Sequence, residues 1–325
     1  MFVRPKIARS LVAAASLALA ACAPATYSIR NPAPSGLAYE IPSAPAEAAV
    51  SVLDERPAEE AFSRGVLPAG ITVDGAPIDP PAFLASGLEQ ELRSRGLPTR
   101  AVVGGQDLPR VHLRSFHILN HRVNAYSPFV TLTLLSADIE TSTGTRRVGV
   151  FVKRGKIPVW SFNEVIEPIF SDPLSLLVKE FSAKFATVTY GYRSSDATVR
   201  EIVERLARRD ARSFLDVYAL GFTNNPTAIP KVVELLDDAD EYVRLAAISS
   251  LGTLGAKSEF GRLKALYEGG AGLWQDRAMA AKAIGDLDTE EGRAWLAAEL
   301  ERIDDAPVSN DTMWTSQIIR LYLDL

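Results

Sequence analysis

The stretch DDADEYVRLAAISSLGTLG, residues 237–255, carries the pattern that decides the fold of this 325-residue chain. Acidic residues, which favour a helix N-terminus, precede a run whose alanines, leucines and isoleucine recur at helical spacing. The run ends at Leu251-Gly252, and glycine suits a helix end because it enters the left-handed conformation at little steric cost. The stretch therefore predicts a helix that ends close to Gly252.

Two further segments align with this one on a pair of an aliphatic residue and glycine. The pairs are Leu220-Gly221 and Ile284-Gly285, so the glycines are 252 − 221 = 31 and 285 − 252 = 33 residues apart. Each segment predicts a helix, a short loop and a second helix. The pattern resembles the HEAT-like repeats found in bilin lyases and many scaffold proteins. This resemblance implies an all-α helical solenoid over residues 195–325, with atypical helices at its ends.

A superhelix of this kind offers a concave surface, which we expect the second helix of each pair to line. The candidate partner-binding residues on these helices are Lys231, Arg262, Tyr267, Arg293 and Trp295. A second interpretation stays open, in which the aromatic residues belong to the core and the charged residues only solvate the helices.

Residues 47–192 predict one α/β domain. Helices are expected from Pro80, with Leu84, Leu88 and Leu92 on one face, and from Asp172. Three β-rich segments lie between them. The order resembles the small α/β domains of several periplasmic lipoprotein families. The predicted fold class is therefore α+β, a small α/β lipoprotein-type domain followed by an all-α HEAT-like helical solenoid.

The N-terminal residues predict export from the cytoplasm. Three cations precede the apolar residues 10–21, which are too few to span a bilayer comfortably. Leu19-Ala20-Ala21-Cys22 resembles the lipobox of bacterial lipoproteins. The resemblance implies a signal peptide over residues 1–21 and acyl chains, palmitate among them, on Cys22. An ordinary signal peptide with a chance cysteine is the alternative.

The residues after the lipobox predict where the protein resides. Residue 23 is Ala rather than Asp, which by the family's sorting rule implies the outer membrane, facing the periplasm. Residues 22–46, rich in Pro, Ala and Ser, predict a flexible tether between the lipidated Cys22 and the folded part.

Composition excludes several kinds of chemistry. Cys22 is the single cysteine, so the chain has no disulfide framework, and with Cys22 acylated it has no thiolate nucleophile either. The net charge of −5 disfavours nucleic acid as a partner. No catalytic constellation or cofactor motif is recognisable, so we expect neither an enzyme nor a cofactor.

Three histidines lie within ten residues, His112, His117 and His121. On a regular strand His117 and His121 share a face, and His112 joins them only if a bulge intervenes. A metal site would use His117 and His121 with a carboxylate from elsewhere. The other interpretation is that these histidines are packed or hydrogen-bonded in the sheet.

These observations favour a lipid-anchored periplasmic scaffold or adaptor that binds other envelope proteins during assembly or transport. The alternatives are a bilin-lyase-like protein, through the repeat resemblance, and a metal-binding lipoprotein.

Overall fold

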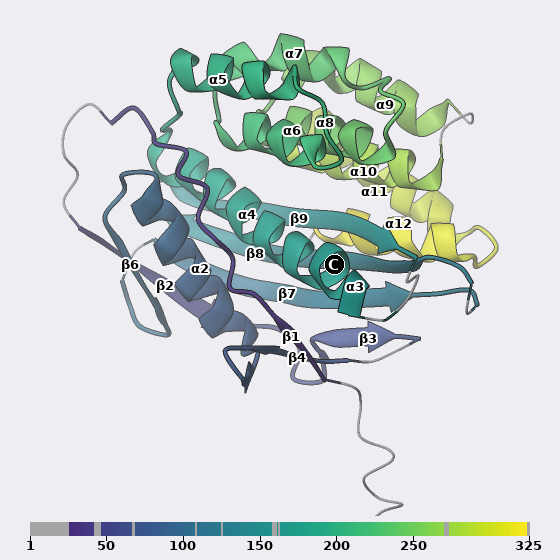
Figure 1. Cartoon of the computed structure of the whole chain (residues 1–325), viewed down its shortest axis with the longest axis horizontal. Coiled ribbons are helices and arrows are strands. Elements are labelled where there is room, and N and C mark those ends of the chain that lie inside the picture. The colour runs from purple at the N-terminus through teal and green to yellow at the C-terminus, as the bar shows by residue number, and fades with distance from the viewer. Residues whose placement is uncertain are drawn as a thin grey trace, which may run out of the picture.

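The computed structural model describes residues 26–41, 47–66, 69–107, 109–124, 126–157, 161, 163–269 and 273–323. The expected signal peptide and Cys22 lie outside these residues. Strands dominate the first half of the described chain and helices the second half (Figure 1). Among the described residues, no helix is both long enough and apolar enough to cross a membrane.

One large mixed sheet forms the centre of the molecule. Its strands lie in the order β6-β2-β7-β8-β9, and β3 pairs with β7 along the same edge as β2. β6, β2 and β3 run parallel to β7, whereas β7, β8 and β9 are antiparallel neighbours. The bounds are β2 (Ala48–Asp54), β3 (Ser63–Gly65), β6 (Thr99–Val103), β7 (Arg110–His121), β8 (Phe129–Thr141) and β9 (Gly144–Lys156). A smaller sheet contains β1 (Thr26–Ile29), β4 (Gly70–Val73) and β5 (Ala76–Pro77).

Two helices cover one face of the large sheet, α2 (Pro80–Ser94) and α4 (Asp172–Tyr190). Two prolines begin α2, where the missing N–H groups would have no helical partner anyway. Its leucines at positions 84, 88 and 92 are fully buried. The chain enters α4 through α3 (Asn163–Ile166) and a π-helical turn, Glu167–Ser171. Both helices predicted in this part of the sequence are confirmed.

Three helix pairs follow, preceded by one helix and closed by another. The first helices of the pairs, α6, α8 and α10, pack side by side. In Figure 1 the second helices α7 and α9 lie above them, and the second helix α11 lies beside α10 and α12. The helix-loop-helix pattern predicted for each repeat is therefore confirmed. The bounds are α5 (Asp196–Leu206), α6 (Ser213–Phe222), α7 (Ile229–Glu234), α8 (Glu241–Thr253), α9 (Phe260–Glu268), α10 (Trp274–Asp286), α11 (Glu290–Asp304) and α12 (Asn310–Arg320).

The three repeat glycines serve a different purpose from the one predicted. Gly221, Gly252 and Gly285 lie within the first helices and are not left-handed. A Cβ at Gly252 would lie 2.8 Å from the Cα of Ala283 on α10, closer than side chains tolerate. Glycine is thus required by the close approach of neighbouring helices. The left-handed residues come three positions later in each repeat, at Asn224, Gly255 and Asp288.

The segment before the large sheet is part of the folded body. β1 pairs with β4 in parallel, and Leu37 and Tyr39 are buried. In Figure 1 this purple segment crosses the layer formed by α2 and α4. The prediction of a flexible tether over residues 22–46 is therefore wrong for residues 26–41, because contacts distant in sequence hold this segment in place.

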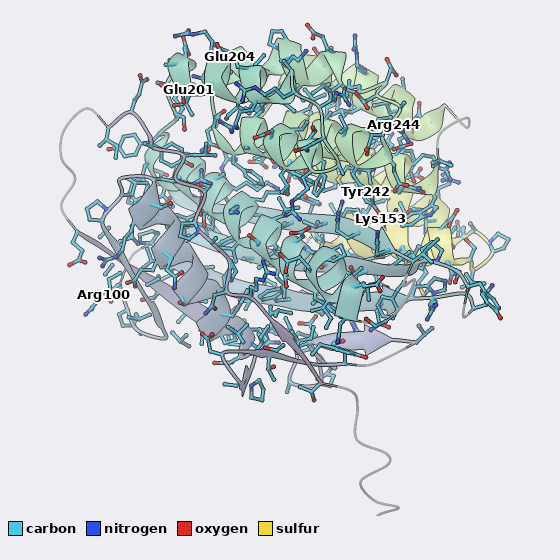
Figure 2. The ribbon with its side chains drawn as sticks, in the orientation of Figure 1. Arg100, Lys153, Glu201, Glu204, Tyr242 and Arg244 are labelled. Carbon is cyan, nitrogen blue, oxygen red and sulfur yellow. The ribbon has the colours of Figure 1, made fainter. Side chains whose placement is uncertain are left out.

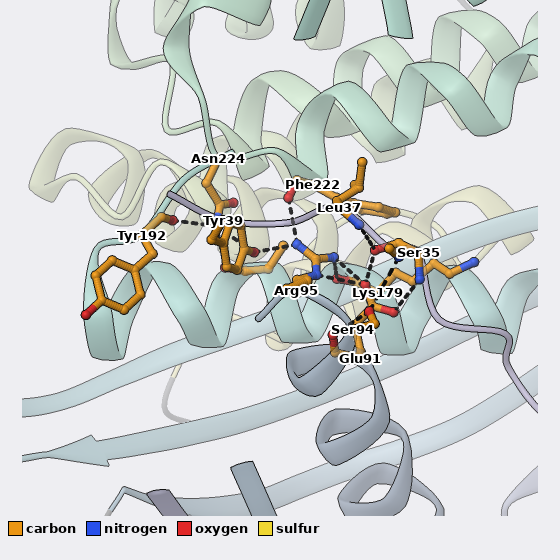
Figure 3. A network of polar contacts seen from close by, with 12 residues as sticks. Ser35, Leu37, Tyr39, Glu91, Ser94, Arg95, Lys179, Tyr192, Phe222 and Asn224 are labelled. Carbon is orange, nitrogen blue, oxygen red and sulfur yellow. Dashed lines mark hydrogen bonds and ion pairs between the residues drawn. The ribbon is translucent and has the colours of Figure 1, made fainter. Parts of the chain in front are cut away.

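An arginine at the end of α2 makes many of those contacts (Figure 3). The Arg95 side chain is completely buried, and it donates to Glu91 Oε1 and to the carbonyl oxygen of Phe222, both at 2.7 Å. It also contacts the hydroxyl of Tyr39. Glu91 in turn accepts a hydrogen bond from the backbone N–H of Ser35 at 2.8 Å. The network joins the N-terminal segment, α2 and α6.

The predicted fold class, a small α/β domain followed by an all-α solenoid, is wrong. The chain is mixed α/β, with a large sheet domain between residues 26 and 156 and a helical region after it. β8 buries Leu134 and Leu135, which point to opposite faces, so both faces of the sheet need cover. Helices α2 and α4 cover one face, and the helical region packs on β9 and reaches the other face through α12.

A cluster of buried charges holds the helical region to the sheet. Lys184 Nζ on α4 donates to Glu180 Oε1 and Asp286 Oδ1, both at 2.6 Å, and to the carbonyl oxygen of Gly149 on β9 at 2.7 Å. Lys282 Nζ on α10 lies 2.7 Å from the other oxygen of Asp286 and 2.5 Å from Glu180 Oε1. Burial alone would lower the pKa of Lys282, but the two carboxylates raise it, so the ammonium group stays charged.

Replacing Gly252 with alanine should lower the free energy of unfolding by about 1–3 kcal/mol, because the new methyl group forces α8 and α10 apart. Gly261 on α9 is the matched control, since a Cβ there has nothing within 4 Å. Gly261→Ala should stabilise the protein by up to about 1 kcal/mol, because alanine has the higher helix propensity. Urea unfolding followed by circular dichroism measures both values. Equal effects at the two positions would contradict the close approach of the helices.

Candidate functional site

The five predicted partner-binding residues all lie on the second helices of the pairs. Three are cations that already have an acidic neighbour on the same or an adjoining turn. Lys231 lies 2.7 Å from Glu234, Arg262 lies 3.4 Å from Glu259, and Arg293 contacts Asp288. We call α7, α9 and α11 the second-helix row. The arginine side chains at 262 and 293 remain about half exposed on it.

The two aromatic residues of the prediction come together where α9 meets α11. Tyr267 on α9 is buried, and its ring meets that of Trp295 on α11 edge-on, with the centroids 4.9 Å apart. The Tyr267 hydroxyl contacts Glu299 on α11. Tyr267 thus helps to pack two helices together, whereas Trp295 is only partly buried.

A cleft that the sequence did not predict lies between the sheet and the helical region. It has a volume of about 700 Å³ and opens where the ends of β7 and β9 and the start of β8 meet the N-terminal ends of α8, α10 and α12. We call it the aromatic cleft. Its lining includes His121, Lys156, Tyr242, Trp274, Gln275 and Trp314.

Aromatic rings and exposed apolar side chains make this cleft unusual for a protein surface. The Trp314 ring lies 4.8 Å from the Trp274 ring and 5.0 Å from the His121 ring, measured between centroids. Val123 and Ile157 line the cleft and are 75% and 48% exposed. A concave pocket lined largely by apolar and aromatic side chains is typical of binding sites.

The sequence contained a weak signal for the aromatic cleft. Leu273-Trp274 and Met313-Trp314 each place two large apolar residues at or near the start of a helix, and Leu273 and Met313 are exposed. The two tryptophans are 40 residues apart (314 − 274), so only the packing of α10 beside α12 brings them together.

Tyr242 joins the aromatic cleft to the edge of the sheet. Its hydroxyl accepts from the backbone N–H of Gly155 at 3.0 Å and donates to the Gly155 carbonyl oxygen at 2.9 Å. It thus satisfies two edge groups of β9 that would otherwise be free to pair with another strand. The Arg154 guanidinium lies over the Tyr242 ring at 4.0 Å, and Lys153 lies beside the same ring (Figure 2).

The histidines do not form the metal site that the sequence raised as a hypothesis. A bulge between Leu113 and Ser115 turns His112 to the same face as the other two histidines. His117, however, contacts Glu60, whereas His121 packs against Trp314. Among the residues that the structure describes, no group of three or more His, Cys, Asp or Glu side chains is placed to hold a metal ion.

His117 lies instead in a polar cleft of about 620 Å³, which the C-terminal end of α12 lines. Its Nε2 lies 2.7 Å from an Arg64 nitrogen, which can only donate, so Nδ1 carries the proton and donates to Glu60 Oε1 at 3.0 Å. The Ser115 hydroxyl lies 3.1 Å from the same Nδ1. In a serine-histidine-acid triad the serine and the acid meet opposite ring nitrogens, so Ser115 is not placed as such a nucleophile.

Glu60 should make the stability of the protein depend on pH. Burial alone would raise its pKa, but hydrogen bonds from His117, Ser115 and the backbone N–H of Phe116 lower it from 4.5 to about 2. A carboxylate with a depressed pKa stabilises the fold above its unfolded pKa, and this stabilisation is lost as the pH falls from 4.5 towards 2. The difference in pKa corresponds to about 3 kcal/mol.

We therefore expect Glu60→Gln to be less stable than the wild type by about 3 kcal/mol at neutral pH, and most of this difference to vanish near pH 2. Urea unfolding at a series of pH values measures it. Asp138 also has a lowered pKa, so the comparison between the two proteins, not the wild-type curve alone, isolates Glu60. A difference that stays constant with pH would contradict the assignment.

Comparison with known proteins identifies one segment of the helical region. The HEAT repeat family model matches residues 228–258, which contain α7 and α8. No curated protein matches the chain. The matched segment overlaps the stretch from which the repeats were recognised, so the HEAT-like character of this part of the chain is confirmed. HEAT repeats generally mediate protein–protein interactions, and this segment of the chain is similar to them.

Proposed function

We propose that this protein is a lipid-anchored periplasmic scaffold, without catalytic activity, that binds other envelope proteins during assembly or transport. The observation that carries the proposal is the HEAT repeat match at residues 228–258. The first helices α6 and α10 contact α4 and β9, and α8 contacts α4, so these helices are engaged by the sheet domain. The second-helix row is therefore the part of the repeats left to receive a partner.

The anchor in this proposal is acylated Cys22. β1 begins at Thr26, four residues after Cys22 (26 − 22). Four residues extend at most roughly 14 Å, at about 3.3–3.6 Å each. A lipid on Cys22 would thus hold the folded body close to the outer membrane. The flexible tether expected from the sequence would instead have allowed a separation of roughly 70 Å between the membrane and the folded body.

The anchor is tested by metabolic labelling. The wild-type protein should incorporate labelled palmitate and fractionate with the outer membrane, and Cys22→Ser should incorporate none. Ala23→Asp is the matched control, because it keeps the lipidated cysteine and by the sorting rule should move the protein to the inner membrane. Wild-type protein without label, or label that persists in Cys22→Ser, would end the lipoprotein proposal.

Partner binding at the second-helix row is tested by photocrosslinking in cells. A benzoylphenylalanine at position 262 or 293 should trap a discrete protein adduct, because both side chains are exposed on the row. Position 100, on the opposite edge strand β6, is the control and should trap none (Figure 2). Adducts at none of the three positions, or equal adducts at all of them, would refute the scaffold. Deletion of the helical region is unsuitable, because it would uncover β9 and the buried charges.

A further inference from the structure

The aromatic cleft is a separate surface from the second-helix row, and its floor is apolar. Trp274, Trp314 and His121 present their rings to it, and Val123 and Ile157 extend the apolar surface outwards. Tryptophans in pockets of this kind carry much of the binding energy at protein interfaces, because a partner's side chain can lose all contact with water there. The floor thus suits one large apolar side chain.

A buried acceptor inside the cleft indicates that an occupant also carries a hydrogen-bond donor. Gln275 lines the cleft and is only 8% exposed, yet its buried Oε1 accepts no hydrogen bond from the residues that the structure describes. A buried acceptor without a donor costs about 1–3 kcal/mol, so an occupant that brings an N–H would recover this energy. The main chain of a polypeptide has such a group, whereas a lipid acyl chain has none.

The charges around the cleft favour an acidic occupant. Lys153 contacts Glu241, and Asp311 lies 3.9 Å from Arg277, so these lining residues are already paired. Lys156, at the end of β9, is exposed and has no ion-pair partner among the residues that the structure describes. A carboxylate placed beside an aromatic side chain of the occupant would meet this lysine.

We propose that the aromatic cleft binds an extended segment of a partner protein that carries an aromatic residue flanked by acidic residues. The aromatic side chain packs on Trp274 and Trp314, a main-chain N–H donates to Gln275 Oε1, and an acidic side chain pairs with Lys156. The proposal rests on the scaffold function and deepens it, because it gives the chemistry of one partner segment and a second place where partners bind.

Fluorescein-labelled peptides added to the purified full chain test this directly. The capped peptide Gly-Asp-Phe-Asp-Gly should bind, by fluorescence anisotropy, at least about tenfold more tightly than Gly-Asp-Ala-Asp-Gly and Gly-Lys-Phe-Lys-Gly, because each of these lacks one of the two recognised features. Equal binding of the three peptides, or no binding of any, would overturn the proposal. So would displacement of the bound peptides by phosphatidylglycerol vesicles, because it would show that the cleft accepts lipid.

Three variants separate specific recognition from loss of folding. Lys156→Glu alters an exposed residue and should reverse the preference, so that the lysine peptide binds more tightly than the aspartate peptide. Lys257→Glu makes the same charge change at an exposed residue outside the cleft, and should leave the preference unchanged. Gln275→Met, which removes the acceptor at similar length, should weaken binding of the aspartate-phenylalanine peptide about fivefold or more.

The results distinguish this proposal from the scaffold itself. Lys156→Glu should leave the crosslinks at positions 262 and 293 intact. An unchanged peptide preference in Lys156→Glu, with those crosslinks present, would refute the aromatic cleft alone. Absence of the crosslinks, with the charge reversal observed, would instead refute the second-helix row.

Discussion

Two lysines, two carboxylates and a tyrosine hydroxyl, buried where α4, β9 and α10 meet, are the interaction on which the rest of the structure depends. Lys184 and Lys282 are paired with Glu180 and Asp286, and the Tyr322 hydroxyl donates to Asp286 at 2.7 Å. Each lysine contacts both carboxylates, so loss of any one charge would leave a net charge buried in the cluster, at a cost of several kcal/mol. The helical region and the sheet are therefore one cooperative body.

This cluster of buried charges determines which surfaces remain for binding. The first helices of the pairs pack towards the sheet domain, and Tyr242 occupies the edge groups of β9. The second-helix row on one side and the aromatic cleft along the junction are among the surfaces that stay open. Both surfaces combine aromatic residues with exposed charges, and aromatic residues and arginine are enriched at protein interfaces. These two surfaces, both formed by the packing of the helices and the sheet, are where we propose that partners bind.

Local patterns in the sequence predicted the elements that local physics controls. The helices at Pro80 and Asp172 and the three helix pairs follow from apolar spacing and helix-start residues, and all are observed. Lys231, Arg262, Tyr267, Arg293 and Trp295 lie on second helices, as the repeat pattern predicted. The sequence could not show that Tyr267 is buried, because the burial of this residue depends on how closely α9 approaches α11. The aromatic cleft escaped prediction for the same reason, since its residues come from strands and helices far apart in the chain.

The sequence by itself determined the repeating helix pairs, the two helices on the sheet and the lipobox-like motif at Cys22, because each of them depends on residues that are close together in the sequence. Tertiary structure alone decided that the sheet is large and mixed, that residues 26–41 join the body, and that Gly252 serves close helix packing. Each of these depends on partners distant in sequence: β4 for β1, Arg95 for Tyr39, and Ala283 for Gly252. Such contacts are stabilised by the burial and pairing of residues that only the folded chain brings together. The spacing of apolar residues along the sequence does not show which distant residues will meet.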